Sequence, residues 1–139
     1  MSRLVLDTNV VAALRSPDGA SAELLRRVRL GRHDLLMSVA LCLEYKAVAG
    51  RRAHLRASGL APGDVRVFVD GLVTLSELIT PWFSWRPSLP DPGDEMVADA
   101  AIAGRADMIV TFNQKDFGPV SDRWPIAVCP PQAVLRTGG

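Results

Sequence analysis

The chain has 139 residues and a formal net charge of +1, and 48% of its residues are hydrophobic. This length suits a single domain spanning residues 1–139, and the hydrophobic content excludes an intrinsically disordered chain. No apolar run approaches the roughly 18 residues that cross a bilayer, and no signal peptide is recognisable, so we expect a cytoplasmic protein. Cys42 and Cys129 lie in apolar surroundings without metal-like spacing and are expected to be reduced core residues.

The first half of the chain alternates short apolar runs with segments of helical spacing. A short, fully apolar run predicts a strand of the kind found at the centre of a parallel sheet. Glycine or a turn closes the helical segments that follow. The predicted strands of this half are residues 4–6 and 34–38, and the predicted helices are residues 10–14, 21–30 and 39–49.

The second half continues this alternation around a proline-rich segment. Residues 59–64 are expected as a loop, and residues 81–94 as an irregular segment, because prolines interrupt regular structure. The predicted strands here are residues 78–80, 106–112 and 125–129, and the predicted helices are residues 65–75 and 95–104.

Short apolar strands that alternate with helices are typical of one fold class. They predict a three-layer α/β fold with a mainly parallel, roughly five-stranded sheet flanked by helices. The working site of such a sheet lies at the carboxyl ends of its strands.

Three carboxylates from distant parts of the sequence are predicted to meet at that edge. Asp7 directly follows the first strand. At about 100° per residue, Glu44 falls in the middle of the apolar stripe of its helix. Asp94 points toward the apolar stripe of the next helix and is also a good N-cap for it. The apolar residues within about 60° of Glu44 are Ala40, Leu41, Ala47 and Val48.

A cation would resolve the repulsion between these acids. A carboxylate buried without compensation is costly, and no Arg or Lys is evident beside the three acids. Mg²⁺ is usually held by one or two carboxylates, with water and substrate phosphate completing its coordination. Each acid also has an ordinary interpretation, as a cap or as part of a helix of different phase. Asp91, Glu95 and Asp99 are expected as surface acids, and His33 and His54 as surface histidines.

Charge is distributed unevenly along the chain. Eight of the 16 Lys and Arg lie in residues 26–56, where the only acids are Asp34 and Glu44. In residues 91–122 the balance reverses, with seven Asp and Glu against two Lys and Arg. An acidic centre with a basic flank suits an anionic polymer that is cut with the help of cations, although ordinary solvated helix faces would give the same distribution.

Three segments of the sequence resemble a known family. "LVLDTNVVAAL", "SVALCLEYKAV" and "LPDPGDEMVADAAIAGRADMIVTFNQKDF" occur in the same order and at similar spacing in PIN-domain nucleases. The chain is most similar to the small stand-alone prokaryotic PIN proteins of toxin–antitoxin pairs, the VapC-like branch. The resemblance covers nearly the whole chain and implies a PIN-like version of the fold described above.

The resemblance also implies roles for individual residues. Asp7, Glu44 and Asp94 match the acids that bind the metal and carry catalysis. Asn113 stands at the fourth catalytic position, which is often Asp in PIN nucleases, so one negative charge is missing and occupancy of a second metal is in question. The supporting polar positions are Thr8, Asn9, Ser38, Thr111 and Asp116.

The implied activity is endonucleolytic cleavage of RNA that depends on Mg²⁺ or Mn²⁺. The implied partners are the RNA substrate, a cognate antitoxin protein and a second copy of the chain in a homodimer, without a membrane. Candidate contacts with RNA or antitoxin are Arg26, Arg27, Arg29, Arg51, Arg52, Arg56, Trp82 and Trp85.

Two other functions deserve comparison with a nuclease. A PIN domain that binds RNA or protein without cutting is favoured by Asn113. A phosphatase of the haloacid dehalogenase type also begins with a strand ending in Asp, but it needs a second Asp two residues later, where this chain has Asn9.

Overall fold

The computed structural model describes residues 2–13, 19–49, 62–81, 89 and 91–136. The expected turn-and-loop segments around residues 14–18, 50–61 and 82–88 lie outside this description, as do His54, Arg51, Arg52, Arg56, Trp82 and Trp85. No helix in the described ranges is long and apolar enough to cross a membrane.

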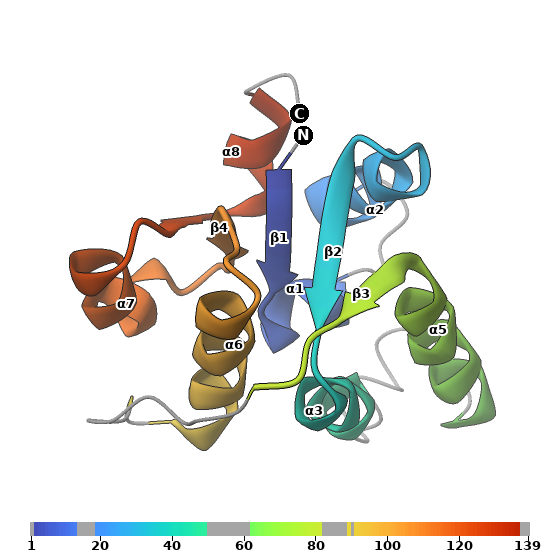
Figure 1. The fold of residues 1–139 in the computed structure, drawn as a ribbon. Helices are drawn as coiled ribbons and strands as arrows, with labels where there is room; N and C mark the ends of the chain where they lie inside the picture. Colours follow the sequence, from blue (N-terminus) through green and yellow to red (C-terminus); the bar gives the residue numbers. More distant parts are fainter. Residues whose placement is uncertain (1, 14–18, 50–61, 82–88, 90, 137–139) are drawn as a thin grey trace.

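A five-stranded, wholly parallel sheet forms the centre of the molecule, in the order β3-β2-β1-β4-β5 (Figure 1). Leu4 of the central strand pairs with Leu35 on one side and Met108 on the other. The α/β class, the parallel sheet and its five strands are therefore confirmed. The strands are β1 (Ser2–Leu6), β2 (His33–Met37), β3 (Ser76–Leu78), β4 (Met108–Val110) and β5 (Ala127–Cys129).

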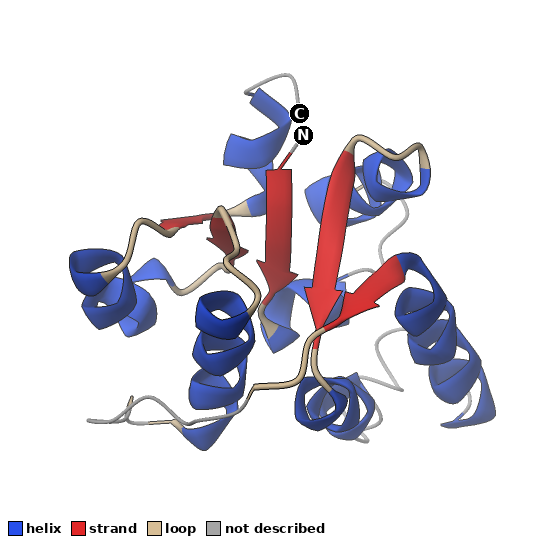
Figure 2. Ribbon diagram, viewed as in Figure 1, coloured by secondary structure: helices blue, strands red, loops and turns tan. Residues whose placement is uncertain are grey.

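Helices cover both faces of this sheet (Figure 2). α6 lies in front, against β1, β2 and β4, and α2 lies behind, against β2 and α8. α3 contacts α1, α5 and α6 below the sheet, so it closes the carboxyl edge. The helices are α1 (Thr8–Ala12), α2 (Ala20–Arg29), α3 (Val39–Ala49), α5 (Pro62–Leu75), α6 (Pro92–Ala103), α7 (Gly118–Arg123) and α8 (Pro131–Arg136), with a 3₁₀ helix η2 (Gln114–Phe117).

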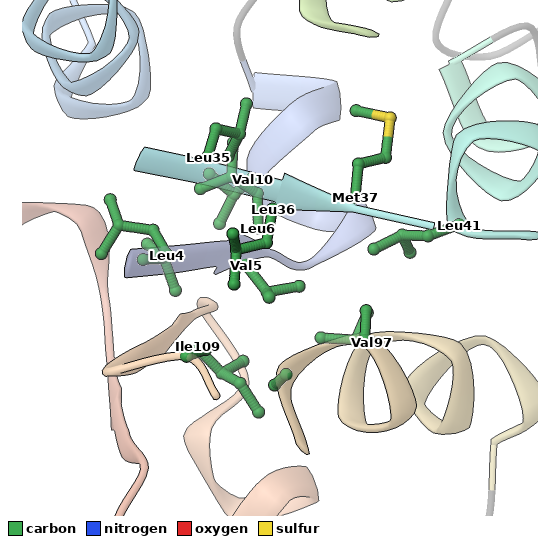
Figure 3. Packing of buried hydrophobic residues seen from close by; sticks show 14 of the residues in the cluster. Leu4, Val5, Leu6, Val10, Leu35, Leu36, Met37, Leu41, Val97 and Ile109 are labelled. Carbon is green, nitrogen blue, oxygen red and sulfur yellow. The ribbon is translucent and has the colours of Figure 1, made fainter. Parts of the chain in front are cut away.

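The core lies between the two central strands and the helices that pack on them. Leu4 and Val5 of β1 are fully buried, and Val97 of α6 and Ile109 of β4 meet them from one side (Figure 3). Burying such a side chain contributes roughly 2 kcal/mol, which explains why β1 tolerates no polar residue between Leu4 and Leu6. The first polar residue after this run is Asp7, at the carboxyl edge.

Several predicted boundaries are wrong for identifiable reasons. α6 begins at Pro92 and not at residue 95, because the Asp91 side chain accepts a hydrogen bond from Gly93 N and Pro92 occupies the first turn, where its missing N–H costs nothing. Asp91, and not Asp94, is therefore the N-cap. β4 is shorter than predicted, because Ala106 N bonds back to the Ala101 carbonyl and closes α6.

Other elements differ because their local signals are weak. α5 begins at Pro62, inside the segment expected as a loop, and β3 precedes the predicted strand by two residues. α7 and α8 have only six residues each, too few to show helical periodicity in the sequence.

Three individual residues also depart from expectation. His33 is buried, at 4% exposure, and does not lie at the surface. Cys42 and Cys129 are free thiols, but both are half-buried and not core residues.

Candidate active site

Asp7 sits at the junction between the central strand and the first helix. Its backbone N donates to the Val110 carbonyl at 2.9 Å, which extends the β1–β4 ladder by one residue. The side chain caps α1 and is 3% exposed. Thr8 N donates to Oδ1 at 2.7 Å, and the Thr111 hydroxyl donates to Oδ2 at 2.7 Å. Two neighbouring strand ends therefore fix this carboxylate.

The same contacts tie the segment after β4 to the start of α1. Asn113 N donates to Thr111 Oγ1 at 2.9 Å. Phe112 N makes a longer contact of 3.5 Å with Asn9 Oδ1. Thr111 is fully buried, so its hydroxyl connects Asp7 to the loop that carries Asn113.

Tyr45 anchors α3 beneath this junction. It is 1% exposed, and its hydroxyl donates a hydrogen bond to the Leu6 carbonyl. Burial, and secondarily the charge of Asp7, raises the pKa of Tyr45 well above its ordinary value, so the phenol stays a neutral donor. This bond holds α3 against the end of β1. Glu44 is the residue directly before Tyr45 on this anchored helix.

The phase predicted for α3 is partly wrong. Leu41 and Tyr45 form the centre of the buried face, whereas Ala40 and Ala47 are exposed. Glu44 is half-buried at the edge of that face and not in its middle. The edge position lets its carboxylate reach a cleft while its stem packs on the core.

A cleft of about 250 Å³ opens between α1, α3 and the first turn of α6. Both predicted helix-borne acids, Glu44 and Asp94, line it, and so does Asp91, which is exposed as expected. Gly93 separates the two helices: a Cβ there would lie 3.3 Å from Glu44 Oε1 and 3.3 Å from Asp91 Oδ1. The remaining lining residues are Thr8, Asn9, Ala12 and Val48.

The charges in and beside this cleft repel one another. Burial raises the pKa of Asp94 to about 7, assisted by the negative charges of Asp7, Asp91 and Asp116. Burial also raises the pKa of Asp7, against the hydrogen bonds from Thr111 and Thr8, which lower it. The ion pairs between described residues involve none of these four acids or Glu44. The site is therefore electrostatically unsatisfied within the described chain.

The residue types fit a hard divalent cation. Carboxylate oxygens are the ligands that Mg²⁺ and Mn²⁺ prefer, and Asp7, Glu44 and Asp94 supply them from three elements. Glu44 and Asp94 line the cleft, whereas Asp7 is buried next to Thr8 and is not among the residues that line it. As they stand, no three Asp, Glu, His or Cys side chains in the described ranges are grouped closely enough to hold one ion. Binding would require the cleft-lining acids to move inward.

The remaining predicted residues divide into two groups. Asn113 and Asp116 are exposed on the loop and 3₁₀ helix after β4, and Asp116 is close enough to influence both Asp7 and Asp94. Ser38 lies away from the acids: its hydroxyl accepts from Leu41 N at 3.0 Å, and it lines a separate cleft of about 280 Å³ with Ile79 and other residues.

The described basic candidates lie at the opposite edge of the sheet. The last turn of α2 leads through residues 30–32 into the start of β2, at the amino edge (Figure 1). Arg26 and Arg27 pair with Glu23, and Arg27 Nη1 donates to the Leu135 carbonyl. Arg29 is exposed beside them. These three residues are therefore remote from the acids.

Sequence reasoning missed two contributors to the site. The anchoring role of Tyr45 was not predicted, because a tyrosine on a helix can equally lie at the surface or in the core. Its position next to Glu44 was a usable signal. The capping role of Asp91 was readable from "DPGD", since Asp before Pro is a common helix start.

Comparison with known proteins agrees with this fold. The model of the PIN domain family matches residues 3–115, which include Asp7, Glu44, Asp94 and Asn113. The chain therefore belongs to the PIN-domain family. PIN domains are generally nucleases that act on nucleic acid and use divalent metal ions. A search of curated proteins found no match to the chain.

Proposed function

We propose that this protein is an endoribonuclease that depends on Mg²⁺ or Mn²⁺ and that its active site is the cleft beside Asp7. The observation that supports it most strongly is a PIN fold in which Asp7 ends the central strand and Glu44 and Asp94 line a cleft at the carboxyl edge, without an ion-pair partner among the described residues. In a chain of 139 residues, such unsatisfied charge is expected only where a ligand compensates it.

Asp7, Glu44 and Asp94 would hold the ion. A divalent cation bound there would acidify a water molecule and offset charge on the phosphate oxygens. Hydrogen bonds from Thr8 and Thr111 fix the orientation of the Asp7 carboxylate. Glu44 or Asp94 would accept the proton from the attacking water.

Asn113 reduces the charge of the site but leaves an acid nearby. Its amide carries no charge at the fourth position, which favours one bound ion over two. Asp116 follows within one turn and raises the pKa of Asp7 and of Asp94 through its charge. We infer that Asp116 partly replaces the missing carboxylate.

We further propose that residues 1–139 act as one VapC-like toxin domain, in the cytoplasm, with an antitoxin and a second copy of the chain as partners. The segment beyond the family match supports one domain, because β5 pairs with β4 in the same sheet. Exposed apolar side chains on α3, Val39 and Leu43, support a protein partner on that face. The arginines of α2 suit the antitoxin better than RNA, because they lie far from the acids.

Cleavage assays test the proposal directly. Purified protein should cut single-stranded RNA with Mg²⁺ or Mn²⁺, leave 5′-phosphate and 3′-hydroxyl ends, and stop when EDTA is added. Equal cleavage in EDTA would contradict a metal mechanism. The second candidate, a binding module without activity, is favoured by the neutral Asn113; binding of RNA without cleavage under any divalent metal would support it. Arrest of growth on expression, relieved by a small neighbouring gene product, would support the toxin role.

A further inference from the structure

Another hollow, formed by the segment after β4, differs in chemistry from the acid cleft. Its volume is about 420 Å³, and five consecutive residues line it: Phe112, Asn113, Gln114, Lys115 and Asp116. This volume falls within the range of roughly 300–1,000 Å³ that is typical of small-ligand sites. The hollow therefore has room for a group the size of a nucleotide.

Phe112 presents an aromatic ring to this hollow. The residue is 40% exposed, whereas the nearby Phe117 is fully buried. A single exposed apolar residue needs no explanation by itself, but here the ring borders a hollow instead of open surface. An aromatic ring at the edge of a hollow is the platform on which proteins stack unpaired bases.

The polar side chains around the ring complement a nucleotide. Asn113 and Gln114 each offer an amide donor and an amide acceptor, which can pair with the edge of a base. Lys115 is exposed and brings a cation next to an otherwise acidic site. Asp116, also in the lining, disfavours a phosphate at its own position, so we place the base and not the phosphate in the hollow.

Backbone contacts connect the segment that lines the hollow to the candidate active site. Phe112 N contacts Asn9, which lines the acid cleft, and Asn113 N bonds the hydroxyl of Thr111, which holds Asp7. These contacts fix the backbone that carries the ring relative to the acids. A nucleotide in the hollow would thus be placed next to a phosphate in the cleft.

We propose that Phe112, Asn113, Gln114 and Lys115 form a subsite for one unpaired nucleotide of single-stranded RNA, with Phe112 stacking on the base and Lys115 contacting the backbone. This proposal rests on the proposed ribonuclease function. It predicts a preference for unpaired RNA, because the faces of paired bases are not available for stacking in a duplex.

Binding measurements on the full chain test the subsite without cleavage. The probes are a fluorescent single-stranded RNA 12-mer of mixed sequence and a ribose-phosphate 12-mer without bases, both in EDTA. Phe112→Ala should weaken binding of the RNA by about 5- to 100-fold and leave the abasic oligomer unchanged. Phe112→Tyr should bind RNA within about twofold of wild type, because it keeps the ring.

Two further variants complete the test. Leu30→Ala removes another exposed apolar side chain, at the far end of α2, and should bind both probes like wild type. Lys115→Gln should weaken the binding of both probes. It should also reduce the slope of log affinity against log salt concentration by about 1, because one phosphate contact is lost.

The outcomes separate this proposal from the nuclease function. The subsite is overturned if Phe112→Ala weakens the binding of both probes equally or of neither. It is also overturned if wild type binds the two probes with equal affinity or binds neither. A base-dependent loss in Phe112→Ala supports the subsite even if wild type cuts no RNA with Mg²⁺ or Mn²⁺, which would overturn only the nuclease function. Cleavage by wild type that Phe112→Ala leaves unchanged, with unaltered RNA binding, would overturn only the subsite.

Discussion

Glu77 and Asp94 are carboxylates in opposite electrostatic environments: the pKa of Glu77 is lowered and the pKa of Asp94 is raised. Glu77, on β3, accepts a hydrogen bond of 2.8 Å from Arg3, and this contact lowers the pKa of Glu77. Asp94, at the carboxyl edge, is partly buried among other acids, and its pKa is raised to about 7. The paired acid joins β1 to β3, and the unpaired one lines a cleft.

The two acids differ in whether the protein itself compensates their charge. Arg3 also donates to the Gly104 carbonyl, and its backbone N donates to Asp107, so charge around Arg3 is satisfied by the protein itself. Around Asp7 the described protein supplies only hydroxyl and amide donors. Charge left uncompensated at one edge is unfavourable in the free protein, and the proposed cation would compensate it.

The largest effect is expected from neutralising the central acid. Asp7→Asn should lower RNA cleavage by about 100-fold or more, since a metal ion supplies several kcal/mol of transition-state stabilisation and each tenfold is about 1.36 kcal/mol. The matched control is Glu77→Gln, which should cut RNA like wild type because Glu77 lies outside the site. Circular dichroism should show that both variants fold. An Asp7→Asn variant that retains full activity would show that Asp7 is no more important for cleavage than Glu77.

A smaller effect is expected from adding one methyl group at the cleft. Gly93→Ala places a Cβ 3.3 Å from carboxylate oxygens of Glu44 and Asp91, which must then shift. We expect cleavage to fall by about 10-fold, in line with changes that misplace the surroundings of metal ligands.

Gly71→Ala is the control for this substitution. A Cβ at Gly71 in α5 meets nothing within 4 Å, so activity should not change, and stability should rise by up to about 1 kcal/mol from the better helix propensity of alanine. Equal activity of the two alanine variants would show that the approach of Glu44 to α6 is unimportant for catalysis.

A separate effect concerns the dependence of folding stability on pH in the absence of metal. The pKa of Asp94 is 3.8 in the unfolded chain and about 7 in the native protein, so the native state binds this proton more tightly. The resulting stabilisation is complete below pH 3.8 and is lost as the pH rises through 7. Asp7, whose pKa is also raised, acts in the same direction.

Thermal unfolding in EDTA measures this dependence. Wild type should lose stability between pH 5 and pH 8 relative to Asp94→Asn, because the variant lacks the titrating group. Parallel curves of stability against pH for the two proteins would mean that the pKa of Asp94 is not raised in the native state.

The sequence was sufficient to predict the fold position of Asp7, because it directly follows an apolar strand of a parallel sheet. The topology also predicted that polar residues after the neighbouring strand approach it, but the direct hydrogen bond comes from Thr111 and not from Asn113 or Asp116. Glu44 was harder, because helical phase was inferred from alanines that tolerate exposure, whereas Tyr45 marks the true buried face.

Features that depend on single tertiary contacts were not predictable. The start of α6 depends on one side-chain hydrogen bond from Asp91, and the burial of His33 depends on where α2 packs. The hollow beside Phe112 arises from the course of the chain after β4, for which the sequence has no periodic signal.

The most direct test of the central claim, that Asp7, Glu44 and Asp94 share one cation, is calorimetric titration of Mn²⁺ at pH 8. The account predicts one ion bound by wild type and affinity lower by about 10-fold or more in each of Asp7→Asn, Glu44→Gln and Asp94→Asn, with Glu77→Gln unchanged. Wild-type affinity in all three variants, or no binding by wild type, would contradict it.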